Sequence, residues 1–260
     1  MYPYWLEIGG LRLPTFGPMV VLGFLSAHLV IKNELRRRGI DPELSTNLIT
    51  AAILGGLAGA KLYFVLFEMP DGSTWGETVR TTFSGSGLTW HGGFLVATAA
   101  VIWTIRRHAA PLPAAADAIG MGLALGYGIG RIGCQLAGDG DYGVPTDLPW
   151  GMAYPEGVVP TDEIVHPAPV YETLMGVATF GLLWRLRRSL EERPGLLFCV
   201  YLVLAGAARF GVETIRLNPQ VLWGMTGAQL FSLVLVAVGI GVGARLLRRQ
   251  PRAADLAKGS

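Results

Sequence analysis

The sequence predicts an all-α integral membrane protein with seven transmembrane helices, an extracytoplasmic N-terminus and a cytoplasmic C-terminus. Three observations predict this class. Hydrophobic residues make up 51% of the 260 residues and charged residues only 15%, whereas a soluble domain has about 25% charged residues. The mean hydropathy is +0.44. Apolar runs of the length that a membrane helix needs, about 20 residues, recur along the whole chain.

The expected helices are joined by short connections except at two places. The long connections 69–88 and 138–167 are rich in Gly, Pro, Asp and Thr, a composition typical of loops. The first twelve residues include Tyr4 and Trp5, aromatic residues of the kind found at membrane interfaces. We expect residues 1–260 to form a single transmembrane domain with the spans 14–32, 47–68, 89–106, 114–136, 168–185, 195–215 and 225–246.

The positions of Lys and Arg predict the orientation, because cytoplasmic connections carry an excess of basic residues. On one side lie only Arg12, Arg80 and Arg216, and the 138–167 connection has no Lys or Arg. This assignment places both long connections outside the cytoplasm. The basic residues on the other side follow the first, third, fifth and seventh spans: Lys32, Arg36, Arg37, Arg38, Arg106, Arg107, Arg185, Arg187, Arg188, Arg193, Arg245, Arg248, Arg249, Arg252 and Lys258.

The common catalytic and metal-binding motifs are missing from the sequence. Cys134 and Cys199 lie far apart in apolar surroundings, which does not indicate a disulfide framework. The N-terminus lacks the basic region and cleavage site of a signal peptide. We expect no metal site, because no His or Cys pair has ligand spacing and Asp139-Gly-Asp141 is typical of a solvated turn. The sequence also lacks a nucleophile elbow, so in an enzyme the nucleophile could belong to a substrate.

Ionisable residues within the expected spans are the main functional signal. Each costs about 2.5 to 3.5 kcal/mol at the centre of a membrane helix on insertion scales. Under the expected topology most of them fall in the outer half of the bilayer, although they are distant in sequence. Ion pairs with a purely structural role would not need to lie at the same depth in the bilayer, so the shared depth favours a common site. The residues are Lys61, His91, Arg131, Glu172, Arg209 and Glu213.

Arg131 lies among glycines in YGIGRIG, near the outer end of the fourth span. The glycines would let another backbone or a lipid headgroup come close. A buried arginine remains charged and must be paired. One interpretation is a structural pair with Glu172 or Glu213. The other is a site for a phosphate, whose geometry matches the guanidinium fork.

The segment ARFGVETIR, residues 208–216, repeats this pattern. Arg209 and Glu213 are four residues apart and share a helix face, as do Arg209 and Arg216. The structural interpretation is an ion pair that allows a charged helix to insert. The functional interpretation has Glu213 orienting Arg209 towards a ligand.

His91 precedes Gly92 and Gly93 in LTWHGGF, at the start of the third span. It is either a satisfied polar residue or a general base, since imidazole exchanges protons near neutral pH. The two glycines would leave room for a substrate beside the ring. His166, in HPAPVYE, has a Pro-rich flank that favours a role at helix entry. We assign no site to His28 and His108, because the sequence around them has no comparable motif.

Taken in order, these motifs resemble the bacterial prolipoprotein diacylglyceryl transferases. The resemblance covers residues 15–245 and rests on HGG, GRIG followed by GDGDYG, PTDLPWGM, HPAPVYE and ARFGVETIR. The stretch at 54–67 also resembles the family's second helix, with Lys61 in place of an arginine. The resemblance implies an enzyme of the bacterial inner membrane, without metal or soluble cofactor and without a nucleic-acid partner.

The resemblance also implies a reaction and roles for residues. The family transfers the diacylglyceryl group of phosphatidylglycerol to the cysteine thiol of a preprolipoprotein lipobox, forming a thioether and releasing glycerol-phosphate. His91, Arg131 and Arg209 match its catalytic positions, and Glu213, Arg216 and Glu172 are supporting residues. The residues expected to bind phospholipid are Arg131, Arg209, Gly92, Gly93, Asp139, Asp141 and Tyr142.

The chain departs from the family pattern around the expected headgroup. Cys134, Gln135 and Ala137 replace Asn, Phe and Asn of the family signature, and Phe16 replaces a tyrosine of the first helix. Asp139 or Asp141 takes the place of a glutamate. Two alternatives therefore remain open: a divergent member with another anionic phospholipid or acceptor, or without activity, and a non-enzymatic transporter or scaffold. An intramembrane hydrolase is disfavoured, because the sequence lacks a nucleophile or metal set.

Overall fold

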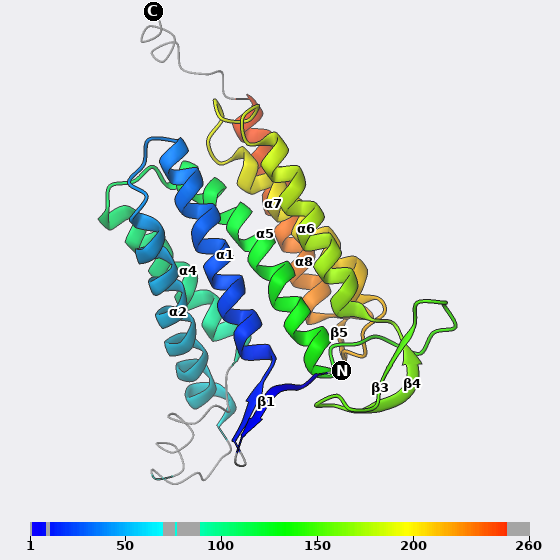
Figure 1. Ribbon diagram of the computed structural model, residues 1–260. Helices are drawn as coiled ribbons and strands as arrows, with labels where there is room; N and C mark the ends of the chain where they lie inside the picture. The colour runs from blue at the N-terminus through cyan, green and yellow to red at the C-terminus, as the bar shows by residue number, and fades with distance from the viewer. Residues whose placement is uncertain (1, 9–10, 70–75, 77–88, 249–260) are drawn as a thin grey trace, which may run out of the picture. The chain divides into compact units, whose positions relative to one another are not determined.

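The computed structural model describes residues 2–8, 11–69, 76 and 89–248 (Figure 1). Most of the expected 69–88 connection, with Arg80, lies outside the described residues, as do Arg249, Arg252 and Lys258. By their contacts the residues form two compact units, one of Met1–Ile31 with Ala116–Ser260 and one of Lys32–Ala115. They are called unit 1 and unit 2.

A helix occupies each of the seven stretches that the sequence marks as apolar. In the part of the chain that the structure describes, five helices are long and apolar enough to cross a membrane: Phe16–Arg37, Leu44–Glu68, Leu112–Ala137, Leu196–Glu213 and Gly227–Arg248. The protein is therefore a mostly helical, polytopic membrane protein. The helices are α1 (Phe16–Arg37), α2 (Leu44–Tyr63), continued by the π-helix η1 (Phe64–Glu68), α4 (Trp90–Arg107), α5 (Leu112–Ala137), α6 (Ala168–Leu186), α7 (Leu196–Glu213) and α8 (Gly227–Arg248).

Within the described residues, three short antiparallel hairpins join or precede the helices, and the all-α prediction did not include them. They pair the backbone groups of connections that would otherwise lack hydrogen-bond partners. Their strands have two to five residues, which is too short for a clear alternation of polar and apolar residues. The hairpins are β1 (Tyr4–Ile8) with β2 (Leu11–Pro14), β3 (Met152–Tyr154) with β4 (Thr161–Val165), and β5 (Gln220–Leu222) with β6 (Met225–Thr226).

Within unit 1, glycines bring α5 close to its neighbours. A Cβ atom at Gly126 would lie 2.9 Å from the backbone oxygen of Gly23 in α1. A Cβ atom at Gly176 in α6 would lie 3.0 Å from the Cα atom of Gly128. Such short separations exclude side chains and allow backbones to touch, as is common between membrane helices. The helix that carries Arg131 is therefore tightly packed against α1 and α6.

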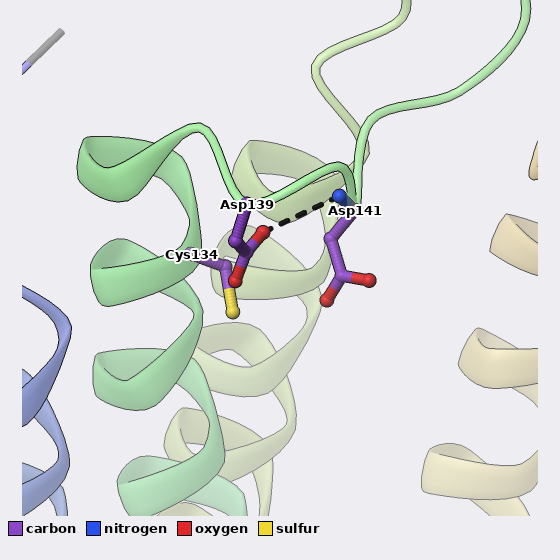
Figure 2. Close-up of side chains that lie close together, drawn as sticks. All are labelled: Cys134, Asp139 and Asp141. Carbon is purple, nitrogen blue, oxygen red and sulfur yellow. Dashed lines mark hydrogen bonds between the residues drawn. The ribbon is translucent and has the colours of Figure 1, made fainter. Parts of the chain in front are cut away.

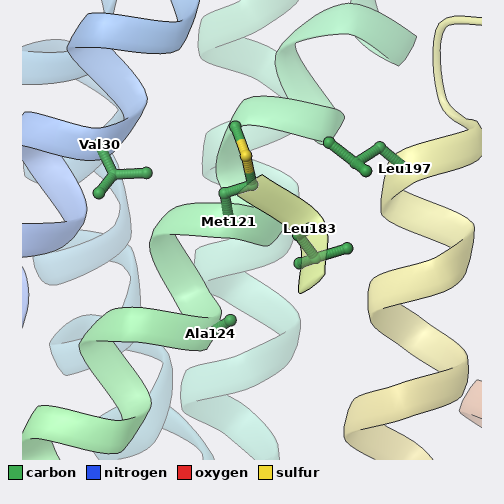
Figure 3. Close-up of a cluster of buried hydrophobic side chains, with 5 residues drawn as sticks. All are labelled: Val30, Met121, Ala124, Leu183 and Leu197. Atoms are coloured by element: carbon green, nitrogen blue, oxygen red, sulfur yellow. The ribbon is translucent and has the colours of Figure 1, made fainter. Parts of the chain in front are cut away.

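A buried apolar cluster holds the same unit together nearer the start of α5 (Figure 3). Its side chains interdigitate from α1, α5, α6 and α7, while α7 and α8 lie side by side along their length. The completely buried side chain of Met121 fills irregular space between the helices. The members are Val30, Met121, Ala124, Leu183 and Leu197.

Asp117 is a buried charge of α5 that the sequence reading did not single out. Its side chain is completely buried and accepts backbone hydrogen bonds from Gly195 at 2.9 Å and Phe198 at 2.8 Å. Gly195 is the residue that precedes α7 and Phe198 lies in its first turn, where a carboxylate satisfies backbone donors and interacts favourably with the helix dipole. Gly195 has a φ of 93°, which glycine adopts without strain. Asp117 thus fixes the start of the helix that carries Arg209.

In unit 2, α2 and α4 pack through facing glycines. The space beside Gly92 is filled by Gly59 and by the side chain of Tyr63, and a Cβ atom at Gly93 would lie 3.1 Å from the oxygen of Gly56. These glycines therefore let two backbones meet.

Candidate functional site

The candidate site of unit 1 is centred on Glu172 of α6, whose side chain is 2% exposed. Its carboxylate lies 2.9 and 2.8 Å from Nη2 of Arg131 on α5. It also accepts a hydrogen bond of 2.7 Å from Nη1 of Arg209 on α7. The hydroxyl of Tyr127 donates a further hydrogen bond of 2.5 Å. One buried carboxylate thus joins three helices. The pairing of Arg131 with Glu172 is one of the two ion pairs that the structural interpretation of the sequence proposed.

Arg131 has additional partners on its own helix and in the following loop. Its Nε donates to the hydroxyl of Tyr127 at 3.2 Å, and its guanidinium lies 5.3 Å from the centre of that ring. Nη1 contacts the sulfur of the buried Cys134 at 3.3 Å and forms an ion pair with Asp141. Each nitrogen of the guanidinium therefore has a hydrogen-bond partner, and two of the partners are carboxylates.

Asp141 bridges two arginines from different segments. One carboxylate oxygen accepts from Arg131 and the other from Arg216, whose Nη1 also donates to the backbone oxygen of Asp141 at 3.3 Å. Burial raises the pKa of the Asp141 carboxyl, but hydrogen bonds from Arg216 and the charges of both arginines outweigh this effect. The net result is a pKa below the ordinary value. Asp141 is therefore ionised at neutral pH.

Glu213 holds the other side of Arg209. The ion pair between them, four residues apart on α7, measures 3.0 Å. Glu213 is buried and also accepts hydrogen bonds from Asn218 at 2.7 Å and from Thr226 at 2.9 Å. Its position is thereby fixed by the hairpin between α7 and α8. The expected contact between Glu213 and Arg209 is present, and the orientation of Arg209 towards a ligand stays a prediction.

These six charged groups are called the charge cluster: Arg131, Arg209, Arg216, Glu172, Glu213 and Asp141. Three guanidinium groups face three carboxylates, so the cluster is formally neutral. Glu172 and Glu213 are buried, whereas the side chains of Arg209 and Asp141 are 29% and 28% exposed. A ligand arriving from outside the protein would therefore meet Arg209 and Asp141 first.

The other polar residues of the 138–143 loop have different partners. Asp139 accepts a hydrogen bond of 3.3 Å from the backbone of Asp141, and both carboxyl groups lie near the sulfur of Cys134 (Figure 2). Three such groups could surround a cation by distance alone. The guanidinium groups of Arg131 and Arg216 already hold Asp141, however, and their charge opposes a cation there.

Tyr142 contacts the segment of the β3–β4 hairpin. Its hydroxyl donates to the oxygen of Val159 at 3.2 Å, and its ring stacks on Tyr154 with centroids 5.0 Å apart. Tyr154 in turn donates to Gln135 at 2.9 Å. These contacts attach the loop to the β3–β4 hairpin, and a role of Tyr142 in phospholipid binding stays a prediction.

His166 connects the same loop to the start of α6. Its backbone exchanges hydrogen bonds with Gly143 at 2.8 Å and with Val144 at 3.1 Å. Its Nδ1 lies 3.2 Å from the hydroxyl of Tyr171, which also accepts a hydrogen bond of 2.7 Å from Trp150. This arrangement agrees with the expected role at helix entry.

His91 belongs to unit 2, whereas the charge cluster belongs to unit 1. It is exposed in the first turn of α4, with its ring centroid 5.4 Å from Trp90 and 6.2 Å from Tyr63. Gly92 and Gly93 pack α4 against α2, as described above. Roles of His91 as a base and of the two glycines in phospholipid binding therefore stay predictions.

Sequence reasoning missed three polar residues that complete the site. Tyr127 lies four residues before Arg131, and this i,i+4 spacing could have identified it. Asn218 and Thr226 approach Glu213 through the β5–β6 hairpin. No local sequence pattern predicts these contacts, because they depend on how the β5–β6 hairpin packs against the end of α7.

The fold and the site together define a helical membrane protein that buries arginines and carboxylates in one neutral cluster. Residues 3–245 match the sequence profile of the prolipoprotein diacylglyceryl transferases. This chain belongs to that family, as its motifs indicate.

Three relatives show the extent of the similarity. The phosphatidylglycerol–prolipoprotein diacylglyceryl transferase of Synechococcus elongatus is 31% identical over 247 residues, covering 92% of this chain and 85% of that protein. The protein of the same name from Clostridium tetani is 29% identical, covering 93% and 96%. A third, from Leptospira interrogans, is 33% identical, covering 80% and 72%.

Proposed function

We propose that this protein transfers the diacylglyceryl group of phosphatidylglycerol to the lipobox cysteine of a preprolipoprotein. The observation that carries the proposal is the convergence of Arg131 and Arg209 on Glu172, within a chain that belongs to the transferase family along nearly its full length. The names of the relatives state the same donor and acceptor. The chain is in this view a lipoprotein-maturing enzyme.

We propose further that all seven helices cross the bacterial inner membrane, with the N-terminus outside and the C-terminus in the cytoplasm. The uneven distribution of Lys and Arg supports this orientation. Under it, the β3–β4 hairpin and Asp141 lie at the outer face. The charge cluster then lies where outer-leaflet headgroups are found.

The arginines are proposed to bind the phosphate of the donor lipid. A guanidinium group presents paired donors that match two phosphate oxygens. Arg131 and Arg209 are held in place by Glu172, and Arg209 is also held by Glu213. Groups fixed in this way need little reorganisation as negative charge grows on the departing phosphate, which favours the transition state.

The reaction itself requires one substitution at carbon. The acceptor thiol loses its proton to a base, and its sulfur attacks the glyceryl carbon of the diacylglyceryl group. The carbon–oxygen bond to phosphate breaks, and its electron pair leaves with glycerol-phosphate. Thiolate is the reactive form of the acceptor, and His91 is the residue that we propose as its base.

Transfer by purified protein tests the proposal. The full-length protein is incubated with labelled phosphatidylglycerol and a lipobox peptide, and the thioether product and released glycerol-phosphate are measured. We expect both products from the wild type and neither from Arg131→Ala, which still inserts into the membrane. Product at the wild-type rate from Arg131→Ala would exclude the assigned role.

The same assay separates the alternatives. Parallel reactions with other anionic phospholipids test a changed donor, and a peptide with serine in place of the lipobox cysteine tests the thiol. Complementation of a transferase-depleted bacterium tests function in the cell. Absence of product with every donor, beside an active control enzyme, would favour a non-enzymatic protein.

A further inference from the structure

Asp141 differs from the other carboxylates of the charge cluster in its surroundings. Glu172 and Glu213 project from helices and are buried, whereas Asp141 lies in a loop and is 28% exposed. Glu172 has Arg131, Arg209 and Tyr127 as partners. Asp141 is therefore the carboxylate of the cluster that can leave with the smallest loss of structure.

The contacts of Asp141 are those that a phosphate would make. Its two oxygens are divided between Arg131 and Arg216, as two oxygens of a phosphodiester can be divided between two guanidinium groups. A carboxylate and a phosphodiester each carry one negative charge. They are consequently interchangeable in charge at this position.

The charge balance favours exchange over simple addition. The six groups of the charge cluster, three arginines and three carboxylates, are neutral together, and the carboxylate of Asp139 beside them adds a further negative charge. A phosphodiester that entered without displacing a carboxylate would leave one uncompensated negative charge, which is costly where solvent is largely excluded. Departure of Asp141 to solvent keeps the cluster neutral while the lipid is bound.

The loop that carries Asp141 has glycines suited to such a movement. Gly138 and Gly140 have φ values of 60° and 90°, a region that glycine occupies about as readily as the negative one. The two glycines lie on either side of Asp139, between the end of α5 and Asp141. Gly138 accepts a hydrogen bond of 2.9 Å from the N–H of Val159 and is held in place, so the movement that frees Asp141 is expected at Gly140 and in the torsions of the Asp141 side chain.

We propose that in the free enzyme the Asp141 carboxylate, held between Arg131 and Arg216, occupies the Arg131 side of the proposed phosphate site, and that the phosphate of the donor lipid displaces it. This inference rests on the proposed function for the identity of the lipid. The return of Asp141 accompanies release of glycerol-phosphate. Asp141 is thus an internal competitor of the lipid, which sets how tightly the phosphate binds.

Binding of a soluble donor analogue tests the exchange. The full-length protein in nanodiscs of phosphatidylcholine is titrated by calorimetry with dihexanoyl-phosphatidylglycerol. We expect Asp141→Asn to bind it about fivefold more tightly than the wild type, equivalent to about 1 kcal/mol. The KM for the donor should fall by a similar factor. Asp162→Asn, an equal change of charge at an exposed position of β4, should bind as the wild type does.

Two further comparisons separate the possible results. Dihexanoylglycerol has the acyl chains without the phosphate, and its affinity should be unchanged by Asp141→Asn. Asp141→Ser serves as a second variant, and thermal unfolding verifies that each variant is folded. Unchanged or weaker binding of the phosphatidylglycerol analogue by both folded variants would overturn the exchange.

The outcome is independent of the transfer reaction. If the wild type binds the analogue but transfers no diacylglyceryl group, the proposed function fails while the effect of Asp141 on phosphate binding is still measured. If transfer proceeds and the Asp141 variants bind no more tightly, the exchange fails and the proposed function stands.

Discussion

Glu172 of α6 accepts a hydrogen bond of 2.7 Å from Nη1 of Arg209 on α7, and the same carboxylate contacts Arg131 on α5. A single buried group therefore determines the distance between two arginines on different helices. This relationship makes Glu172 the residue on which the geometry of the proposed phosphate site depends most.

Replacing Glu172 by Gln should abolish transfer and lower stability. Glutamine keeps the size of the side chain but leaves a buried excess of positive charge, and removing one partner of a buried pair costs about 3 kcal/mol or more. Thermal unfolding in detergent and the transfer assay measure the two effects. Glu163→Gln, at an exposed position of β4, is the matched control, and equal behaviour of both variants would contradict a central role of Glu172.

Replacing Tyr127 by Phe should reduce transfer more than it reduces stability. The change removes the hydroxyl that donates to Glu172 and accepts from Arg131, while the ring beneath the guanidinium remains. We expect a loss of about 1 kcal/mol in stability and about a tenfold decrease in kcat/KM. Steady-state kinetics would refute this role if kcat/KM matched that of Tyr2→Phe, a control at an exposed tyrosine.

Replacing Asp117 by Ala should destabilise the protein by about 2 kcal/mol, because two N–H groups at the start of α7 lose their acceptor. Asn retains one acceptor oxygen, so Asp117→Asn should lose about half as much. Chemical unfolding in detergent gives both values. Equal stability of all three proteins would show that the carboxylate does not cap α7.

The ion pairs of Asp141 predict a dependence of stability on pH. Because Arg131 and Arg216 hold its pKa below the ordinary 3.8, its contribution is present above that value and decreases as the pH falls through the lower, folded-state pKa. Asp139 and Cys134 also face this carboxyl. The difference in melting temperature between wild type and Asp141→Asn should be constant near neutral pH and shrink only in strong acid. A difference that already shrinks well above 3.8 would contradict the lowered pKa.

The helices could be predicted from sequence because each is a long apolar run, and the cost of charge in lipid made Arg131, Arg209 and Glu172 visible. The hairpins could not, since their strands are short and their pairing is set by the ends of the helices. Asp117 escaped notice because its partners are backbone groups of Gly195 and Phe198. Hydrogen bonds to backbone groups cannot be predicted from the spacing of side chains in the sequence.

The partners of the charge cluster were only partly predictable for a related reason. Arg209 and Glu213 are neighbours on one helix, so their contact follows from spacing. The pairing of Arg131 with Glu172 rather than Glu213 depends on how α5 and α6 approach through Gly128 and Gly176. Such a close approach is a property of the packed helices.

The capping of α7 by Asp117 has a consequence for how a lipid enters. Gly195 and Arg209 lie 14 residues apart, about 21 Å along a helix. Asp117 anchors one end of α7, and Glu172 anchors the guanidinium near the other. Sliding of α7 along its axis would break contacts at both ends together. We therefore expect α7 to keep its position when a lipid binds, and any displacement that accompanies binding to occur in the neighbouring helices.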